Sequence, residues 1–257
     1  MMAFTSAALL VTVALPQPKD SSFWRHGDGW LAVGAVAATG IAVVFDERIA
    51  RWTRTPAVQG DSRRNDLVKA VTVVNEMPLT VASIVTYGVG KLTRSATVAD
   101  VGAHWTEALV ATEVVSEVVR SGLGRKRPRA SQDDAFVFGP GRGLTQFEYR
   151  SWPSLHAAVA FATAASLSEE MRLRNASARR VIAPLLYAGA TIPGFTRLYL
   201  DQHWASDIVA GTIVGAFLGS RVVSYAHGRR TFVDRILLGA QVAPRAGGFD
   251  VGWTLER

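Results

Sequence analysis

The sequence predicts an all-α protein, a bundle of six helices with a short β-hairpin at its C-terminal end. Two observations predict the bundle and one predicts the hairpin. Six apolar stretches of 14 to 19 residues follow one another, separated by connections rich in Arg. The 257-residue chain is 49% hydrophobic with a mean hydropathy of +0.17, which excludes global disorder and allows a buried core. In the last residues, apolar and polar side chains alternate instead of repeating with a helical period.

The six helices are expected at 29–45, 77–90, 103–119, 153–168, 181–196 and 208–226. Asn75 is a suitable N-cap for the second helix, and Pro78 fits its first turn. None of the stretches contains the roughly 18 to 20 uninterrupted apolar residues of an unambiguous membrane span. They are therefore interpreted either as short spans or as core helices of a compact bundle. The polar stretch 51–69 is expected to be a connection that carries a surface helix.

The two ends of the chain differ from the helical part, which we expect to be one domain over 16–235. Residues 1–15 are uncharged and mostly apolar and end at Pro16, so they resemble the apolar part of a secretory signal with small residues near its end. They lack the basic residues that usually precede such a segment, and a short first helix is the alternative. Residues 236–257 are expected to form a strand pair, 236–243 against 249–255, with a turn over 244–248 at Gly247 and Gly248.

Composition excludes several kinds of chemistry. The chain has no Cys, so it has no disulfide, no thiolate nucleophile and no Cys-ligated metal. Its five His are spread along the sequence without a tight cluster, so no metal site and no cofactor are expected. The formal net charge is +7, and only four of the 28 basic residues are Lys. Arg suits the bidentate recognition of oxyanions. This bias hints at phosphate, although a GC-rich genome would produce it too.

The first chemical cluster runs from Arg120 to Pro128. A helix is expected to end at Arg120, where Gly122 and Gly124 interrupt it, and Pro128 restricts Arg127 to extended backbone. Two guanidinium groups that flank a glycine loop can fold around one tetrahedral anion. The alternatives are a solvated basic loop or a patch for nucleic acid or anionic lipid. Aromatic residues for base stacking are missing from this stretch, so we expect no nucleic-acid partner.

The second cluster, Pro153-Ser154-Leu155-His156, opens an apolar helix, with Ser154 as its expected N-cap. A helix start presents free backbone N–H groups and the positive end of the helix dipole, so it can bind an anion. His156 lies in the first turn, where the alternative is a hydrogen-bonded structural histidine.

The third cluster begins at Thr196-Arg197 and continues to His203 and Asp207. If His203 and Asp207 share a helix, they lie on one face, four residues apart. The carboxylate can then hold one imidazole nitrogen and leave the other free to attack, which is how a nucleophile is oriented. A common ion pair on a helix face is the alternative.

Taken together and in this order, the three clusters resemble the three-part signature of the type 2 phosphatidic acid phosphatase (PAP2) superfamily. This family includes lipid phosphate phosphatases, bacterial class A acid phosphatases and vanadium haloperoxidases. The resemblance covers residues 120–207 by motif. Three positions depart from the usual pattern: Arg120 replaces Lys, Leu155 replaces Gly and Thr196 replaces Ser.

The resemblance implies a metal-independent phosphatase in which His203 attacks phosphorus and becomes phosphohistidine. It implies that Asp207 orients His203 and that His156 protonates the leaving oxygen and then activates water. The resemblance also implies that Ser154 and the backbone N–H of Leu155 bind the phosphoryl oxygens at the helix start. Three guanidinium groups would bind them as well, those of Arg120, Arg127 and Arg197. The implied substrate is a lipid phosphate or polyprenyl diphosphate. The alternatives are phosphotransfer to an alcohol, a soluble periplasmic acid phosphatase and a non-enzymatic anion- or lipid-binding protein.

The distribution of charge favours membrane association with an extracytoplasmic site. With six spans, the three motifs share one face, and Arg residues at 172–180 and 229–235 lie on the other. The positive-inside rule places the second face in the cytoplasm. The basic residues of 46–76 and a cleaved signal would both argue against this orientation, and a cleaved signal would favour a periplasmic protein.

Overall fold

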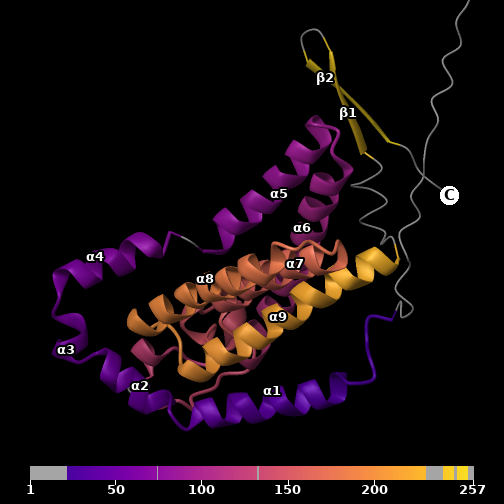
Figure 1. Cartoon of the computed structure of the whole chain (residues 1–257). Helices are drawn as coiled ribbons and strands as arrows, with labels where there is room; N and C mark the ends of the chain where they lie inside the picture. The colour runs from indigo at the N-terminus through magenta and orange to yellow at the C-terminus, as the bar shows by residue number, and fades with distance from the viewer. Residues whose placement is uncertain (1–21, 74, 132, 230–239, 246–247, 254–257) are drawn as a thin grey trace, which may run out of the picture.

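The computed structural model describes residues 22–73, 75–131, 133–229, 240–245 and 248–253. The expected signal-like segment 1–15 lies outside them, as does the start of the expected first strand. Figure 1 shows an all-α body with a small strand pair beyond it. The main helices are α1 (Asp28–Val43), α5 (Glu76–Leu92), α6 (Ala96–Leu123), α7 (Leu155–Leu173), α8 (Arg179–Tyr199) and α9 (Ala205–Gly228). All six expected helices are confirmed, and α6 is longer than expected at both ends.

The connection between α1 and α5 holds more helix than the single surface helix expected at 51–69. It contains α2 (Asp46–Thr53), α3 (Pro56–Gln59) and α4 (Ser62–Val71), which trace an arc around one end of the bundle in Figure 1. The expected N-cap of α5 is confirmed, since the Asn75 side chain accepts a hydrogen bond from the N–H of Met77 at 3.1 Å. Three single-turn 3₁₀ helices, η1 (Pro128–Ala130), η2 (Arg142–Leu144) and η3 (Phe147–Tyr149), shape the loop between α6 and α7.

The C-terminal strand pair is confirmed, with a different first strand. β1 (Ala240–Arg245) pairs antiparallel with β2 (Gly248–Trp253), and Ala240 lies opposite Trp253. Pro244, expected in the turn, is in β1 opposite Phe249. β1 therefore ends two residues later than the first strand expected at 236–243.

Close packing of α7 on α9 forms the centre of the bundle. Gly211, Gly215 and Gly219 of α9 recur every four residues and face the Ala-rich side of α7. A Cβ at Gly215 would lie 1.9 Å from the carbonyl oxygen of Ala158, so only glycine permits this approach. Small residues at such spacing let helix backbones come together without large side chains between them. The contact fixes the start of α7 beside the start of α9.

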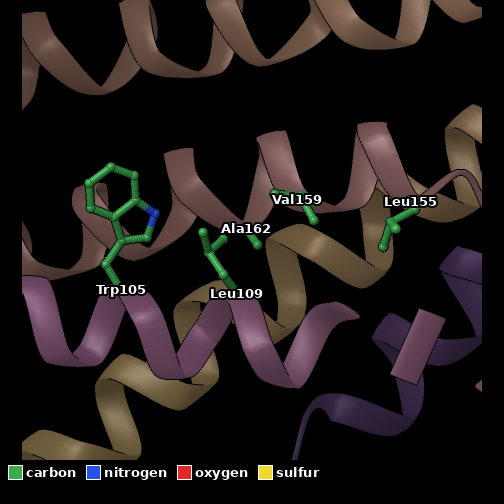
Figure 2. Packing of buried hydrophobic residues seen from close by; sticks show 5 residues of the cluster. All are labelled: Trp105, Leu109, Leu155, Val159 and Ala162. Atoms are coloured by element: carbon green, nitrogen blue, oxygen red, sulfur yellow. The ribbon is translucent and has the colours of Figure 1, made fainter. Parts of the chain in front are cut away.

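α6 packs on the other side of α7 through larger apolar side chains. Figure 2 shows Trp105 and Leu109 of α6 directed at Leu155, Val159 and Ala162 of α7, all of them buried. The indole N–H of Trp105 also donates to the hydroxyl of Thr163 at 3.1 Å. The C-terminal end of α6 and the N-terminal end of α7 are thereby held at the same end of the bundle.

The outer surface of the bundle is strongly apolar. Large hydrophobic side chains are exposed along α1, α5, α6 and α8, for example Trp30, Val81, Val118 and Phe195. Apolar area of this extent marks contact with lipid or protein. Helices α8 and α9 and the stretch Ser62–Leu92 are long and apolar enough to cross a membrane, and α1 with α2, bent by 50°, is a fourth candidate span. These exposed apolar faces and candidate spans indicate that the protein associates with a membrane.

Candidate active site

The three sequence clusters meet at one end of the bundle. They come from the C-terminal ends of α6 and α8 and the N-terminal ends of α7 and α9. One local expectation is wrong, because α6 does not end at Arg120 but continues to Leu123. It ends at Gly124, whose φ of 60° and close approach to the Gly139 carbonyl both require glycine. Arg127 has the extended backbone expected before proline.

His203 is almost fully buried, and one of its two ring nitrogens has a partner among the described residues. Its Nδ1 lies 2.8 Å from the backbone carbonyl oxygen of Ser151 and 3.5 Å from Oδ2 of Asp207. Its Nε2 is buried and makes no hydrogen bond there. A carbonyl can only accept, so Nδ1 carries the proton and Nε2 presents a lone pair. Burial lowers the pKa of His203 to about 4, which keeps the ring neutral at physiological pH.

His203 and Asp207 do not share a helix, so the condition under which both would lie on one helix face is not met. His203 lies in the loop before α9, and Asp207 is in the first turn of α9. The same carboxylate oxygen, Oδ2, accepts hydrogen bonds from the N–H of Trp204 at 2.8 Å and from the hydroxyl of Ser151 at 2.5 Å. Asp207 therefore fixes both the loop that carries His203 and the residue whose carbonyl holds the imidazole.

Behind Asp207 is a fully buried ionic network that the sequence did not reveal. The Arg125 guanidinium donates to Asp207 Oδ1 and to Asp46 Oδ2, both at 2.7 Å. Asp46 in turn accepts from the N–H of Ser206 at 2.8 Å. The carboxylates of Asp46 and Asp207 are fully buried, so their negative charges require the Arg125 cation as a partner. The network ties α2 and the loop after α6 to the start of α9.

His156 lies in the first turn of α7 and faces His203. The two ring centroids are 6.4 Å apart, and His156 Nε2 is 3.1 Å from a carboxylate oxygen of Glu76. The pKa of His156 is lowered to about 2 by burial and by the positive charges of Arg197 and other nearby cationic groups. A bound dianion would offset those charges and raise the pKa of His156.

Three guanidinium groups surround the two histidines. Arg127 is 1% exposed, stacks on Phe147 at 4.2 Å and donates to the carbonyl of Gln202 at 3.0 Å. Burial lowers the pKa of Arg127 to about 10, so it stays charged at neutral pH. Arg197 donates to the Gln202 side chain at 3.0 Å. Arg120 is also buried and pairs with Glu117.

Unpartnered polar atoms gather in this cluster. In the described residues, six buried side-chain atoms lack a hydrogen-bond partner, and four of them belong to residues singled out from the sequence: Ser154 Oγ, His156 Nδ1, Arg197 Nε and His203 Nε2. Buried polar groups are nearly always satisfied, so this concentration makes the cluster the candidate ligand site. Ser154 is the N-cap residue by position, but its side chain makes no capping bond.

The side chain of Leu155 belongs to the hydrophobic core between α6 and α7 (Figure 2). It is the first residue of α7, so its N–H is one of those a helix leaves without an internal acceptor. Leu in place of the family's usual Gly thus adds core packing and leaves the backbone donor in place.

Residues 102–231, just over half of the chain, match the PAP2 superfamily. The chain belongs to this family. A lipid A 4'-phosphatase from Bacteroides thetaiotaomicron is 30% identical over 138 residues, which are 48% of this chain and 57% of the relative. The chain thus matches little more than half of that relative's length. A transmembrane PAP2-type phosphatidylglycerolphosphate phosphatase from Bacillus subtilis has the same fold at 16% identity, with a TM-score of 0.59 over 79% of this chain and 99% of its own.

Sequence reasoning missed several residues that the structure brings to the site, among them Arg125, Ser151 and Glu76. Arg125 was one of several basic residues in its loop, and nothing in the pattern separated it from Lys126. Ser151 contributes mainly a backbone carbonyl, which leaves no sequence signal. Glu76 is the first residue of α5, 80 positions before His156, and only the fold brings the two together.

Proposed function

We propose that this protein is a lipid phosphate phosphatase that works through a phosphohistidine on His203. The arrangement of unpartnered atoms carries the proposal: a histidine nitrogen with a free lone pair faces a second histidine, an unpaired guanidinium nitrogen and an unpaired hydroxyl. Phosphoryl transfer needs positioned cations and N–H donors around the equatorial oxygens, and this cluster supplies them from Arg120, Arg127 and Arg197. Membership of the PAP2 family and the resemblance to lipid phosphatases support it.

In the first step Nε2 of His203 forms a bond to phosphorus, and the bond from phosphorus to the ester oxygen breaks. His156 donates a proton to that oxygen, so the alcohol leaves neutral. In the second step His156 removes a proton from water, the water oxygen attacks phosphorus, and the P–N bond breaks to release phosphate and restore His203. Ser154 and the start of α7 bind the phosphoryl oxygens. None of these steps requires a metal ion.

We propose that the substrate is a membrane lipid with a terminal phosphate or diphosphate. The apolar outer faces of α1, α5 and α8 support a protein that meets its substrate in a lipid phase. We assign catalysis to residues 16–235, which contain the family match, and leave the strand pair of 236–257 outside the catalytic unit.

The activity test compares the purified full-length protein with His203→Ala on a panel of lipid phosphates and soluble monoesters, in detergent and EDTA. We expect phosphate release from lipids, largely abolished in the variant, and a matched control, His26→Ala, that retains activity. Activity that survives in His203→Ala would refute the nucleophile. Release from soluble monoesters alone would refute the lipid substrate, and a phosphorylated product after addition of an alcohol would indicate a transferase.

We propose further that the site faces the extracytoplasmic side of the membrane, because Arg172, Arg174, Arg179 and Arg180 lie at the opposite end of the bundle. The Cys-free sequence gives a clean test. Thr145→Cys, on the exposed loop at the site end, and Ser177→Cys, at the other end, are treated in intact cells with a membrane-impermeant maleimide. We expect labelling of the first variant only, and labelling of the second only would reverse the orientation.

A further inference from the structure

A second cluster of titratable side chains lies outside the candidate active site and has no part in its mechanism. His104 of α6 and His227 of α9 both contact the same carboxylate oxygen, Oε1 of Glu170 in α7. The distances are 2.6 Å from His104 Nδ1 and 3.0 Å from His227 Nε2. The two rings are 5.0 Å apart between centroids. His104 and Glu170 are buried, and the His227 side chain is 15% exposed.

The three residues sit on the same helices as the active-site cluster, at their opposite ends. His104 precedes Arg120 on α6 by 16 residues, Glu170 follows His156 on α7 by 14, and His227 follows Asp207 on α9 by 20. At 1.5 Å per residue these separations are about 21 to 30 Å. The cluster is therefore a distinct site at the other end of the three-helix core.

The ligand atoms suit a divalent transition-metal ion. Two imidazole nitrogens and one carboxylate oxygen, all within 4.8 Å of one another, form the His₂Glu set that zinc takes with water as its fourth ligand. Ligands about 2.0 to 2.2 Å from an ion lie farther apart than 2.6 Å, so the His104 ring must move back by several tenths of an ångström. The partial exposure of His227 gives water access to the remaining position.

The surroundings of Glu170 also favour this role. Arg174 donates to its other oxygen, Oε2, at 2.9 Å and reaches Asp100 at 3.4 Å. Arg174 thereby fixes the carboxylate and directs Oε1 toward the two histidines, as outer partners of metal ligands do. Its positive charge is shared with Asp100, which reduces its repulsion of a bound cation.

We propose that His104, Glu170 and His227 form a binding site for one divalent transition-metal ion of the zinc class, which clamps α6, α7 and α9 at the end remote from the candidate active site. The ion would replace hydrogen bonds that now join three helices far apart in sequence. The expectation of no metal site, drawn from the spread of the histidines along the chain, is thereby revised.

The test uses the full-length protein in detergent, stripped with chelator and then dialysed. Titration with Co²⁺ reports tetrahedral coordination through visible absorption, and competition with Zn²⁺ gives the affinity and stoichiometry. We expect one ion per chain and a rise in melting temperature on zinc addition. His227→Gln, which can still donate to Glu170, and His104→Ala should each weaken binding by at least 100-fold.

Two control variants locate the ion. His26→Ala and His203→Ala should bind Zn²⁺ like the wild type, because neither residue belongs to the cluster. Absence of stoichiometric binding in the wild type would overturn the proposal and leave a buried ion-pair cluster. Loss of binding in His203→Ala, or unchanged binding in the folded His227→Gln protein, would overturn it as well. Because the readouts are binding and melting temperature, the outcome is independent of the proposed phosphatase activity.

Discussion

Replacement of Gly215 by Ala should separate α7 from α9 and misalign the active site. The added Cβ would lie 1.9 Å from the carbonyl oxygen of Ala158, whereas an ordinary carbon–oxygen contact is about 3.3 Å. The obstructing atom belongs to the backbone, so no change of rotamer relieves the contact. The helices must move apart by roughly 1.4 Å or deform. Overpacking of this kind costs about 1 to 3 kcal/mol of folding free energy.

The same displacement moves His156, on α7, relative to His203, which is anchored to the start of α9. A misplacement of about 1 Å between reacting groups can cost about 100-fold in rate. We therefore expect Gly215→Ala to lose about two orders of magnitude in kcat and to melt at a lower temperature.

Phosphate release and thermal unfolding in detergent measure these two effects. The control is Gly189→Ala in α8, where a Cβ would meet no atom within 4 Å. This control should keep its activity and gain slightly in stability, because Ala favours helix more than Gly does. Full activity in Gly215→Ala together with an unchanged melting temperature would refute the proposed role of the glycine contact.

Three further predictions concern the His203 network. Since burial lowers the pKa of His203 to about 4, NMR titration should find its ring neutral down to about pH 5, and titration near 6.5 would contradict this. Asp207→Asn should reduce kcat by about 10- to 100-fold. This loss is smaller than the roughly 10⁴-fold loss in enzymes where an Asp alone sets the histidine tautomer, because the Ser151 carbonyl also holds Nδ1 of His203. A loss equal to that of His203→Ala would contradict it. Arg125→Met leaves Asp46 and Asp207 buried without their cation and should destabilise the fold by about 3 to 5 kcal/mol in thermal or denaturant unfolding. A shift below 1 kcal/mol would show that the network contributes little.

The apolar stretches located the main helices because each of these segments is apolar along most of its length, whether it packs in the bundle or lies on its surface. The helix ends were harder to predict, since they depend on single residues. Gly122 looked like a helix breaker, yet a Cβ there would meet nothing within 4 Å, and it lies inside α6. Gly124 ends the helix because it alone adopts a left-handed backbone beside Gly139. Sequence does not distinguish two such glycines.

The motif residues could be singled out from the sequence because the PAP2 signature places particular side chains in a particular order. Their supporting partners were not found, for two physical reasons. Ser151 orients His203 through a carbonyl oxygen that every residue possesses. Asp46 and Glu76 reach the site from α2 and α5, and only tertiary packing brings them there. The cluster of His104, Glu170 and His227 was also not found, because its members lie up to 123 positions apart and only tertiary packing brings them together.

At His203, two different groups share the work that a single carboxylate does in many active sites. One sets the tautomer of the imidazole, and the other stabilises its positive charge. Ser151 O is 2.8 Å from Nδ1, while the nearest Asp207 oxygen is 3.5 Å away and is already bonded to Ser151 Oγ and Trp204 N–H. The backbone carbonyl therefore sets the tautomer, because it can only accept. Asp207 positions the carbonyl and the loop. In the proposed mechanism its charge also stabilises the ring as positive charge develops on it during attack. The guanidinium of Arg125 also binds the Asp207 carboxylate, so it weakens the effect of the Asp207 charge on the His203 ring. In the proposed mechanism, His203 is thus neutral before it attacks phosphorus and its positive charge is stabilised afterwards.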